Sequence, residues 1–189
     1  MTHRGELYLA LIHHPIRSPK GGVIATAITN VDLHDFARLG RTYDCRRVFI
    51  VTPVTRQQEL VQSICDHWTT GSGARKNPDR MEAMRLLEVQ PSIEHAIVAI
   101  ESARGARPSI AVTGAALAEA TDDPRALAGD LASGRDVLLL FGTGWGLTEE
   151  TLGMADRRLQ PIKGRLDGYN HLSVRSAAAI ILDRLFRND

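Results

Sequence analysis

The sequence has few cysteines and no long apolar run, and both absences narrow its class. Cys45 and Cys65 are its two cysteines, and neither belongs to a C-x-x-C motif. They supply neither a disulfide framework nor a zinc knuckle, which suits a reducing compartment. No stretch approaches the ~18 apolar residues of a membrane span. The start, Met-Thr-His-Arg-Gly-Glu-Leu, lacks the apolar core of a secretory signal. We therefore expect a soluble, cytoplasmic protein with no membrane contact.

The sequence also lacks an excess of either charge. Its 23 Lys and Arg and 22 Asp and Glu give a net charge of +1, which argues against a histone-like binder or an acidic disordered tail. The length of 189 residues with 43% hydrophobic positions predicts a single domain over residues 1–189. Basic residues still gather in the N-terminal quarter, either as an RNA-binding track or as solvated surface arginines. They are Arg17, Lys20, Arg38, Arg41, Arg46 and Arg47.

Apolar runs alternate with segments of helical periodicity. Nearly continuous apolar runs are typical of strands that are buried on both faces of a parallel sheet. The sequence therefore predicts an α/β fold with a mainly parallel sheet flanked by helices. Residues 70–78 resemble a linker that is too short to divide domains. The expected strands are 7–12, 48–51, 110–112 and 137–141, and the expected helices begin near Asp32, Thr55 (as a capping box), Ser92, Asp123 (as an N-cap) and Val174.

A glycine-rich loop follows the strongest predicted strand. Its sequence is Phe141-Gly142-Thr143-Gly144-Trp145-Gly146, in which alternate glycines permit positive φ angles and a close approach of backbone to a ligand. The G-x-G-x-G spacing differs from the dinucleotide fingerprint G-x-G-x-x-G, and no G-K-[ST] of a Walker loop is present. The alternative to a ligand site is a tight turn between a strand and a helix.

Two further loops complete the set of candidate binding segments, because ligands of open α/β sheets bind beyond the carboxyl ends of the strands. Thr113-Gly114 ends one predicted strand, and its alternative is a plain strand end. A polar segment from Leu159 to Ser176 leads into the last helix, whose N-terminus favours polar or anionic ligands. The alternative for that segment is helix capping by Asn170 or Ser173.

These motifs together resemble a known family. The segments Phe-Gly-Thr-Gly-Trp-Gly-Leu (141–147), Leu-Gln-Pro-Ile (159–162) and Tyr-Asn-His-Leu-Ser-Val-Arg-Ser-Ala (169–177) are similar to those of small bacterial S-adenosylmethionine-dependent RNA methyltransferases of the SpoU–TrmD (SPOUT) superfamily. Ala-Leu-Ile-His-His-Pro (10–15) and Asn-Pro-Asp-Arg (77–80) also fit. The resemblance therefore covers nearly the whole chain.

The resemblance implies a C-terminal deep trefoil knot that holds S-adenosylmethionine, and a homodimer that shares its active site across the interface. The last helix agrees with a dimer, because Ala179, Ile180 and Phe186 lie outside its main apolar stripe. RNA, either tRNA or rRNA, is the implied substrate, and no metal is implied. The implied cofactor-binding residues are Thr113, Gly114, Phe141, Gly142, Thr143, Gly144, Trp145, Gly146, Ile162, Tyr169, Asn170, His171, Leu172 and Ser173.

The resemblance also assigns candidate catalytic residues. Arg38 matches the arginine of the first SpoU motif, and its guanidinium can hold a phosphate bidentately. Asp32 stands where that motif has asparagine, and it can equally be a helix N-cap. His171 stands in place of the asparagine of the superfamily's Asn-x-Ser. Arg38 has a structural alternative of its own, an ion pair with Asp35 one helical turn earlier.

Two other functional classes stay open. A metal-dependent hydrolase could use His13, His14, Asp32 and His34, although His13 and His14 would point to opposite faces of a strand. A knotted protein that binds RNA or cofactor without catalysis is the other alternative. A chelator-sensitive activity would favour the hydrolase, whereas donor binding without methyl transfer would favour the non-catalytic protein.

Overall fold

A computed structural model of the protein describes residues 4–117, 119–165 and 169–187. A six-stranded sheet in the order β5-β4-β1-β7-β6-β8 forms its centre, and all neighbouring strands in it run parallel. A short antiparallel hairpin, β2–β3, follows β1. The strands are β1 (Leu7–Ile12), β2 (Ile16–Arg17), β3 (Val23–Ile24), β4 (Arg47–Val51), β5 (Leu87–Gln90), β6 (Ser109–Val112), β7 (Val137–Gly142) and β8 (Arg157–Arg158).

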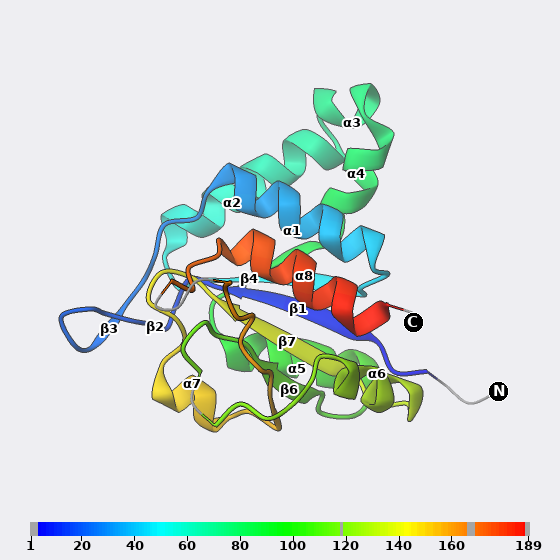
Figure 1. Ribbon diagram of the computed structural model, residues 1–189. Helices are drawn as coiled ribbons and strands as arrows, with labels where there is room; N and C mark the ends of the chain where they lie inside the picture. The colour runs from blue at the N-terminus through cyan, green and yellow to red at the C-terminus, as the bar shows by residue number, and fades with distance from the viewer. Residues whose placement is uncertain (1–3, 118, 166–168, 188–189) are drawn as a thin grey trace.

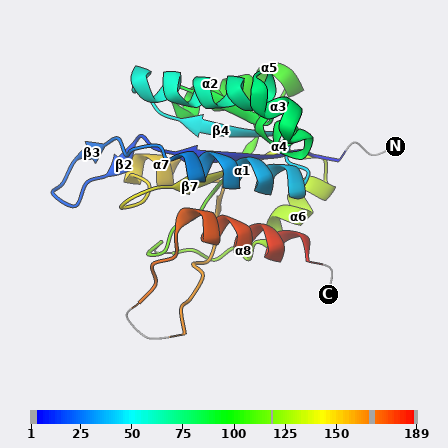
Figure 2. The ribbon, with the colours of Figure 1, turned by 90° about the horizontal axis from the view of Figure 1, so that it is seen from above.

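Helices cover both faces of this sheet (Figures 1 and 2). Side chains of α1, α2, α6 and α8 pack on one face, and those of α5 and α7 pack on the other. No helix in the described part of the chain is long and apolar enough to cross a membrane. The helices are α1 (Asn30–Thr42), α2 (Thr55–Thr69), α3 (Ser72–Lys76), α4 (Pro78–Met84), α5 (Ile93–Arg104), α6 (Arg125–Ala132), α7 (Glu149–Gly153) and α8 (Val174–Phe186).

The central strand β1 shows why continuous apolar runs predicted a covered sheet. All six of its residues are buried. Because successive side chains of a strand point to opposite faces, Leu7, Leu9 and Leu11 join the core beneath α1 and α8. Tyr8 and Ile12 join the core beneath α5. The predicted α/β architecture and the four predicted strands are confirmed.

The sequence patterns missed two strands of the central sheet. β5 is an edge strand in which Glu88 and Gln90 interrupt the apolar residues, and all four of its residues are only partly buried. β8 is two arginines long and pairs with the other side of β6. Neither strand has the continuous apolar run that marks a strand buried on both faces.

Several predicted boundaries are wrong by a turn or less. α1 begins at Asn30 with Thr29 as its N-cap, so Asp32 lies in the first turn rather than at the cap. α2 has Val54 at its N-cap, and Thr55 makes no capping bond. Asp123 accepts a bond from the Arg125 amide, although α6 itself begins at Arg125. The expected linker contains the short helix α3.

Candidate functional site

The glycine-rich loop begins at the carboxyl end of β7, between the ends of β1 and β6. Ile12 of β1 pairs with Gly142 in the sheet. The Thr143 amide and hydroxyl both donate to the Ile12 carbonyl, at 3.2 and 2.8 Å. Gly144 and Gly146 have φ angles of +53° and +90°, which favour glycine. The loop is therefore a fixed turn that depends on its glycines and is bonded to the central strand.

A series of hydrogen-bonded polar side chains, His13, Thr26 and Thr143, connects this loop to the rest of the protein. The Thr26 hydroxyl lies 2.5 Å from the Thr143 hydroxyl and 3.0 Å from His13 Nδ1. Since Thr143 donates to Ile12, Thr26 can donate to Thr143 and His13 Nδ1–H can donate to Thr26. Burial lowers the pKa of His13 to about 4, against the opposing effect of Asp32, so the imidazole is neutral. This series links the hairpin segment to the glycine loop.

Gly144 faces this hairpin segment. A Cβ atom on Gly144 would lie 3.0 Å from Thr26 Cγ2 and 3.6 Å from Ile16 Cγ2. The backbone of the hairpin also contacts the loop, because the Arg17 amide donates to the Gly146 carbonyl at 3.0 Å. Gly144 therefore serves the close approach of the hairpin to the loop, whereas Trp145 points outward with 63% of its surface exposed.

The other two candidate loops meet each other beside β7. The Thr113 hydroxyl donates to the Leu140 carbonyl, which ties the end of β6 to β7. Asn170 Nδ2 donates to the Ala115 carbonyl at 3.0 Å and so joins the loop after β6 to the segment before α8. Ser173, not Asn170, is the N-cap of α8, and its hydroxyl accepts from the Ser176 amide. Of the two predicted capping residues, Ser173 is thus confirmed.

The surface of these loops is unusual for its apolar side chains and its unpaired backbone. Tyr169 and Leu172 are 65% and 48% exposed, and the Tyr169 ring meets His171 edge to face. Ile162 packs partly buried against the core. Within the described chain, residues 161–165 and 169–172 form no backbone–backbone hydrogen bonds. Exposed rings beside free amide and carbonyl groups suit a ligand with a flat, hydrogen-bonding ring. Gly114 is not needed for a close approach within the chain, because a Cβ atom there would lie 3.5 Å from Leu117 Cβ, an ordinary van der Waals contact.

Asp32 lies apart from solvent at the junction of α1 and α8. Its carboxylate accepts from the Thr29 hydroxyl and from Arg175 Nη1. Arg175 Nε also lies 3.2 Å from Asp35. Arg175 therefore joins the first turn of α1 to the first turn of α8, two residues after Ser173. The sequence motif contained Arg175, but its role was missed because both of its partners lie more than 100 residues away.

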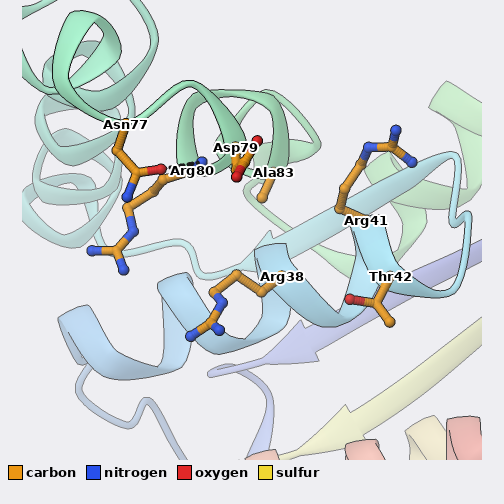
Figure 3. A pocket seen from close by; sticks show the side chains of 7 residues that line it. All are labelled: Arg38, Arg41, Thr42, Asn77, Asp79, Arg80 and Ala83. Atoms are coloured by element: carbon orange, nitrogen blue, oxygen red, sulfur yellow. Dashed lines mark hydrogen bonds between the residues drawn. The ribbon is translucent and has the colours of Figure 1, made fainter.

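Arg38 is exposed on another side of α1, where it lines a cavity with residues of α4 (Figure 3). The expected alternative, an ion pair between Arg38 and Asp35, is absent, because Asp35 pairs with Arg175. In the described structure no contact joins Arg38, Asp32 and His171 to one another. The three predicted catalytic residues are thus dispersed within one chain.

The basic residues of the N-terminal quarter do not form a continuous free track. Four of the six lie within 3.5 Å of a glutamate: Arg17 with Glu149, Arg41 with Glu82, Arg46 with Glu6 and Arg47 with Glu88. Lys20 and Arg38 have no ion-pair partner among the described residues. Arg38 is therefore the arginine of that group whose charge is most available to a ligand.

The candidate metal ligands are not brought together. His13 is buried with Nε2 unpaired, and His34 packs edge to face on Trp68. Asp32 is engaged by Arg175. Within residues 4–117, 119–165 and 169–187, no three His, Cys, Asp or Glu side chains are grouped so that they could hold a metal ion. The hydrolase alternative has no structural support.

Similarity to known proteins identifies the family. Residues 6–187 match the family described as SAM-dependent RNA methyltransferase. The chain belongs to this family. A tRNA (guanine-N(1)-)-methyltransferase of Oleidesulfovibrio alaskensis is 41% identical over 182 residues, which are 95% of this chain and 42% of that protein. The chain thus spans about two fifths of the length of that relative.

Two further similarities concern the length and the fold of this member of the SAM-dependent RNA methyltransferase family. An uncharacterized protein of Aquifex aeolicus is 38% identical over 96% of this chain and 88% of its own length. The crystal structure of the SpoU methyltransferase AviRb from Streptomyces viridochromogenes, in complex with AdoMet, matches with a TM-score of 0.59 and 14% identity, over 97% of this chain and 57% of that one. This likeness confirms the SPOUT-type fold, while the knot stays a prediction.

Proposed function

We propose that the protein transfers a methyl group from S-adenosylmethionine to RNA. The observation that carries the proposal is that the ends of β6 and β7, with the loops at 113–117 and 141–146, meet the described residues of the segment before α8 (162–165 and 169–173) on one edge of the sheet. Their exposed rings and unpaired backbone groups suit the adenine and ribose of the donor. Family membership supports the same chemistry. The guanine-N1 specificity in the name of the O. alaskensis relative belongs to a protein of which more than half lies outside the match.

The residues of the three loops fit the donor. Backbone groups of Gly142, Ile162 and Leu172 would bind the adenine edge, and Trp145 and Tyr169 offer apolar surface. Bound S-adenosylmethionine would supply the methyl group of its sulfonium, which would pass in line to an RNA atom as the S–CH3 bond breaks and S-adenosylhomocysteine leaves. The protein therefore has mainly to align donor and acceptor. The full proposed cofactor set is Thr113, Gly114, Phe141, Gly142, Thr143, Gly144, Trp145, Gly146, Ile162, Tyr169, Asn170, His171, Leu172 and Ser173.

The candidate catalytic residues have different parts in this proposal. Arg38 orients the acceptor nucleotide and its phosphate through its planar guanidinium. Asp32 acts through Arg175, by holding the first turn of α8 beside the donor loops. His171 lies in the exposed segment before α8, and in this proposal it takes a proton from the acceptor. Because Arg38 lies apart from the loops of its own chain, a second copy of the chain would bring Arg38 and donor together.

We further propose a cytoplasmic homodimer of single-domain chains, with residues 1–189 as the domain. Partly exposed Ala179 and Ile180 on α8 support the dimer, because apolar surface on a second side of a helix favours another contact. Phe186 supports it less, since its ring stacks on Tyr43 of the same chain at 5.8 Å. A monomeric mass by light scattering at ~50 μM, well above a micromolar dissociation constant, would refute the dimer.

Donor binding and methyl transfer test the proposal separately. Calorimetry should give a micromolar dissociation constant for S-adenosylmethionine, about −8 kcal/mol. Asn170→Ala removes the bond to Ala115 and should weaken donor binding about tenfold, equivalent to ~1.4 kcal/mol. Gln62→Ala, which removes an exposed amide bond on α2, is the matched control. No heat and no thermal shift at millimolar donor would exclude the function.

Methyl transfer is measured with labelled donor and total RNA from cells that lack the protein, followed by nucleoside mapping. Incorporation into one nucleoside is the expected result and identifies the acceptor. Donor binding without incorporation into any RNA would replace the enzyme with a non-catalytic cofactor-binding protein.

A further inference from the structure

A hollow in the molecule lies between α1 and the start of α4, apart from the three donor loops. It is a cavity of about 320 Å³ that is open to solvent, with buried Ala83 at its base. Figure 3 shows Arg38 of α1 and Arg80 of α4 turned toward the same end of the cavity, with Arg41 at the other end. Its lining residues are Arg38, Arg41, Thr42, Asn77, Asp79, Arg80 and Ala83.

The sequence around the start of α4 positions the hydrogen-bond donors that line this cavity. Asn77 is the N-cap of α4, and its Oδ1 accepts from the Arg80 amide, so that its Nδ2 donor stays available. The Arg80 guanidinium stacks 4.9 Å over the Trp68 ring, which fixes its position without neutralising it. The motif Asn-Pro-Asp-Arg at 77–80 therefore shapes one wall of the cavity.

Charges in the cavity favour an anion. Glu82 binds Arg41 at 2.7 Å and neutralises it. Arg38 and Arg80 have no carboxylate partner among the described residues, and Asp79 is the single acidic side chain in the lining. The pKa of nearby His34 responds to the same positive charges. Burial and the charges of Arg80 and Arg38 lower it, against the effect of Asp35. Two guanidinium groups aimed at one small space can bind phosphate oxygens.

We propose that this cavity binds a backbone phosphate of the RNA substrate between Arg38 and Arg80. The inference rests on the proposed function and adds Arg80, Asn77 and the α4 wall to it. A cavity that is open to solvent and lined by hydrogen-bond donors suits one phosphate of a long chain, whose neighbouring phosphates stay outside it. Arg38 is six residues from Asp32, about 9 Å along α1, and lies apart from the donor loops of its own chain. A phosphate bound here therefore belongs to an RNA whose acceptor nucleotide reaches the donor of a second copy.

The experiment is binding of fluorescently labelled total tRNA to the protein of residues 1–189 at several salt concentrations. Arg80→Gln removes the guanidinium that lies over Trp68, and with it the charge, while it keeps a polar side chain at this position. It should weaken tRNA binding three- to tenfold and lower the slope of log affinity against log salt by about one, because one phosphate contact is lost. Arg107→Gln, an exposed arginine in the loop between α5 and β6, is the matched control and should change neither quantity.

The outcomes separate this proposal from the proposed function. Unchanged tRNA affinity and salt slope in a folded Arg80→Gln, or equal losses in Arg107→Gln, overturn the phosphate site while donor binding by calorimetry leaves the methyltransferase proposal intact. Wild-type protein that binds donor but no RNA overturns both. Inorganic phosphate that binds as tightly as tRNA, and is lost in Arg80→Gln, assigns the cavity to a small phosphate ligand and overturns the RNA assignment.

Discussion

Two arginine sites lie on different sides of α1, and they differ in whether a carboxylate pairs with the guanidinium. Arg175 reaches α1 from α8 and finds both Asp32, 9% exposed in its side chain, and Asp35. Arg38 and Arg80 line the cavity between α1 and α4, and neither pairs with a carboxylate among the described residues. A guanidinium that already has its carboxylates holds helices together, whereas one without them is available to an external anion. The same residue type thus has a structural role on one side and a binding role on the other.

Arg38 is where the comparison predicts the largest effect. Arg38→Ala should leave donor affinity nearly unchanged and reduce the rate of methyl transfer by about 10²-fold, because the lost contact orients the acceptor in the transition state. Arg38→Lys should recover part of the rate, since a point charge cannot reproduce a bidentate contact. The measurement is single-turnover transfer from labelled donor to the mapped RNA. Full activity in Arg38→Ala would remove the residue from the site and turn attention to Asp32, His34 and His171.

For Arg175 we expect the main effect of a substitution to be on the stability of the fold, in contrast to the effect on rate expected for Arg38. Arg175→Ala leaves the buried Asp32 carboxylate without its cation, and we expect the free energy of unfolding to fall by about 2 kcal/mol, less than for a fully buried pair because Arg175 is one third exposed. Urea unfolding measures the change. Arg184→Ala, exposed on the same helix, is the control and should stay within ~0.5 kcal/mol of wild type. Equal stabilities of the two variants would contradict a structural role for Arg175.

The sequence predicted the parts of the fold that depend on local pattern. β1, β4, β6 and β7 are continuous apolar runs, and each became a strand of the parallel sheet. β5 could not be found in the same way, because an edge strand buries less of its surface and tolerates Glu88 and Gln90. The caps of α1 and α2 shifted because several residues near each helix start are able to cap, and tertiary contacts decide among them.

In the candidate site, too, features set by neighbouring residues could be predicted, whereas contacts between distant residues could not. The glycine loop and the α8 N-cap could be predicted because they depend on the backbone chemistry of neighbouring residues. The pair of Arg175 and Asp32 joins residues 143 positions apart, and no spacing rule brings them together. The bond between Thr26 and Thr143 spans 117 positions and was missed as a support of the loop for the same reason. Arg38 was predicted, whereas its α4 neighbours needed the folded chain.

The pKa of His34 gives a local test of the cavity between Arg38 and Arg80, with the smallest expected effect. Its pKa lies below the ordinary value of 6.5 because of burial and the charges of Arg80 and Arg38. Arg80→Gln removes one of those charges and should raise the pKa, as followed by NMR of the imidazole. Bound tRNA should raise it in wild type, because a phosphate offsets both arginines. Arg184→Ala, an exposed change on α8 away from His34 and its charged neighbours, should leave it nearly unchanged.

The sign of the stability effect follows from the same shift. With the folded-state pKa below the unfolded value, the unfolded chain takes up the proton first as the pH falls below 6.5, so the free energy of unfolding decreases with acidification. That decrease should be smaller in Arg80→Gln than in wild type, because its folded-state pKa lies closer to 6.5. A His34 titration that neither Arg80→Gln nor bound tRNA moves would mean that the cavity holds no excess positive charge. The unpaired arginines Arg38 and Arg80 would then not form a binding site for an anion, and the proposed difference from the paired Arg175 would be wrong.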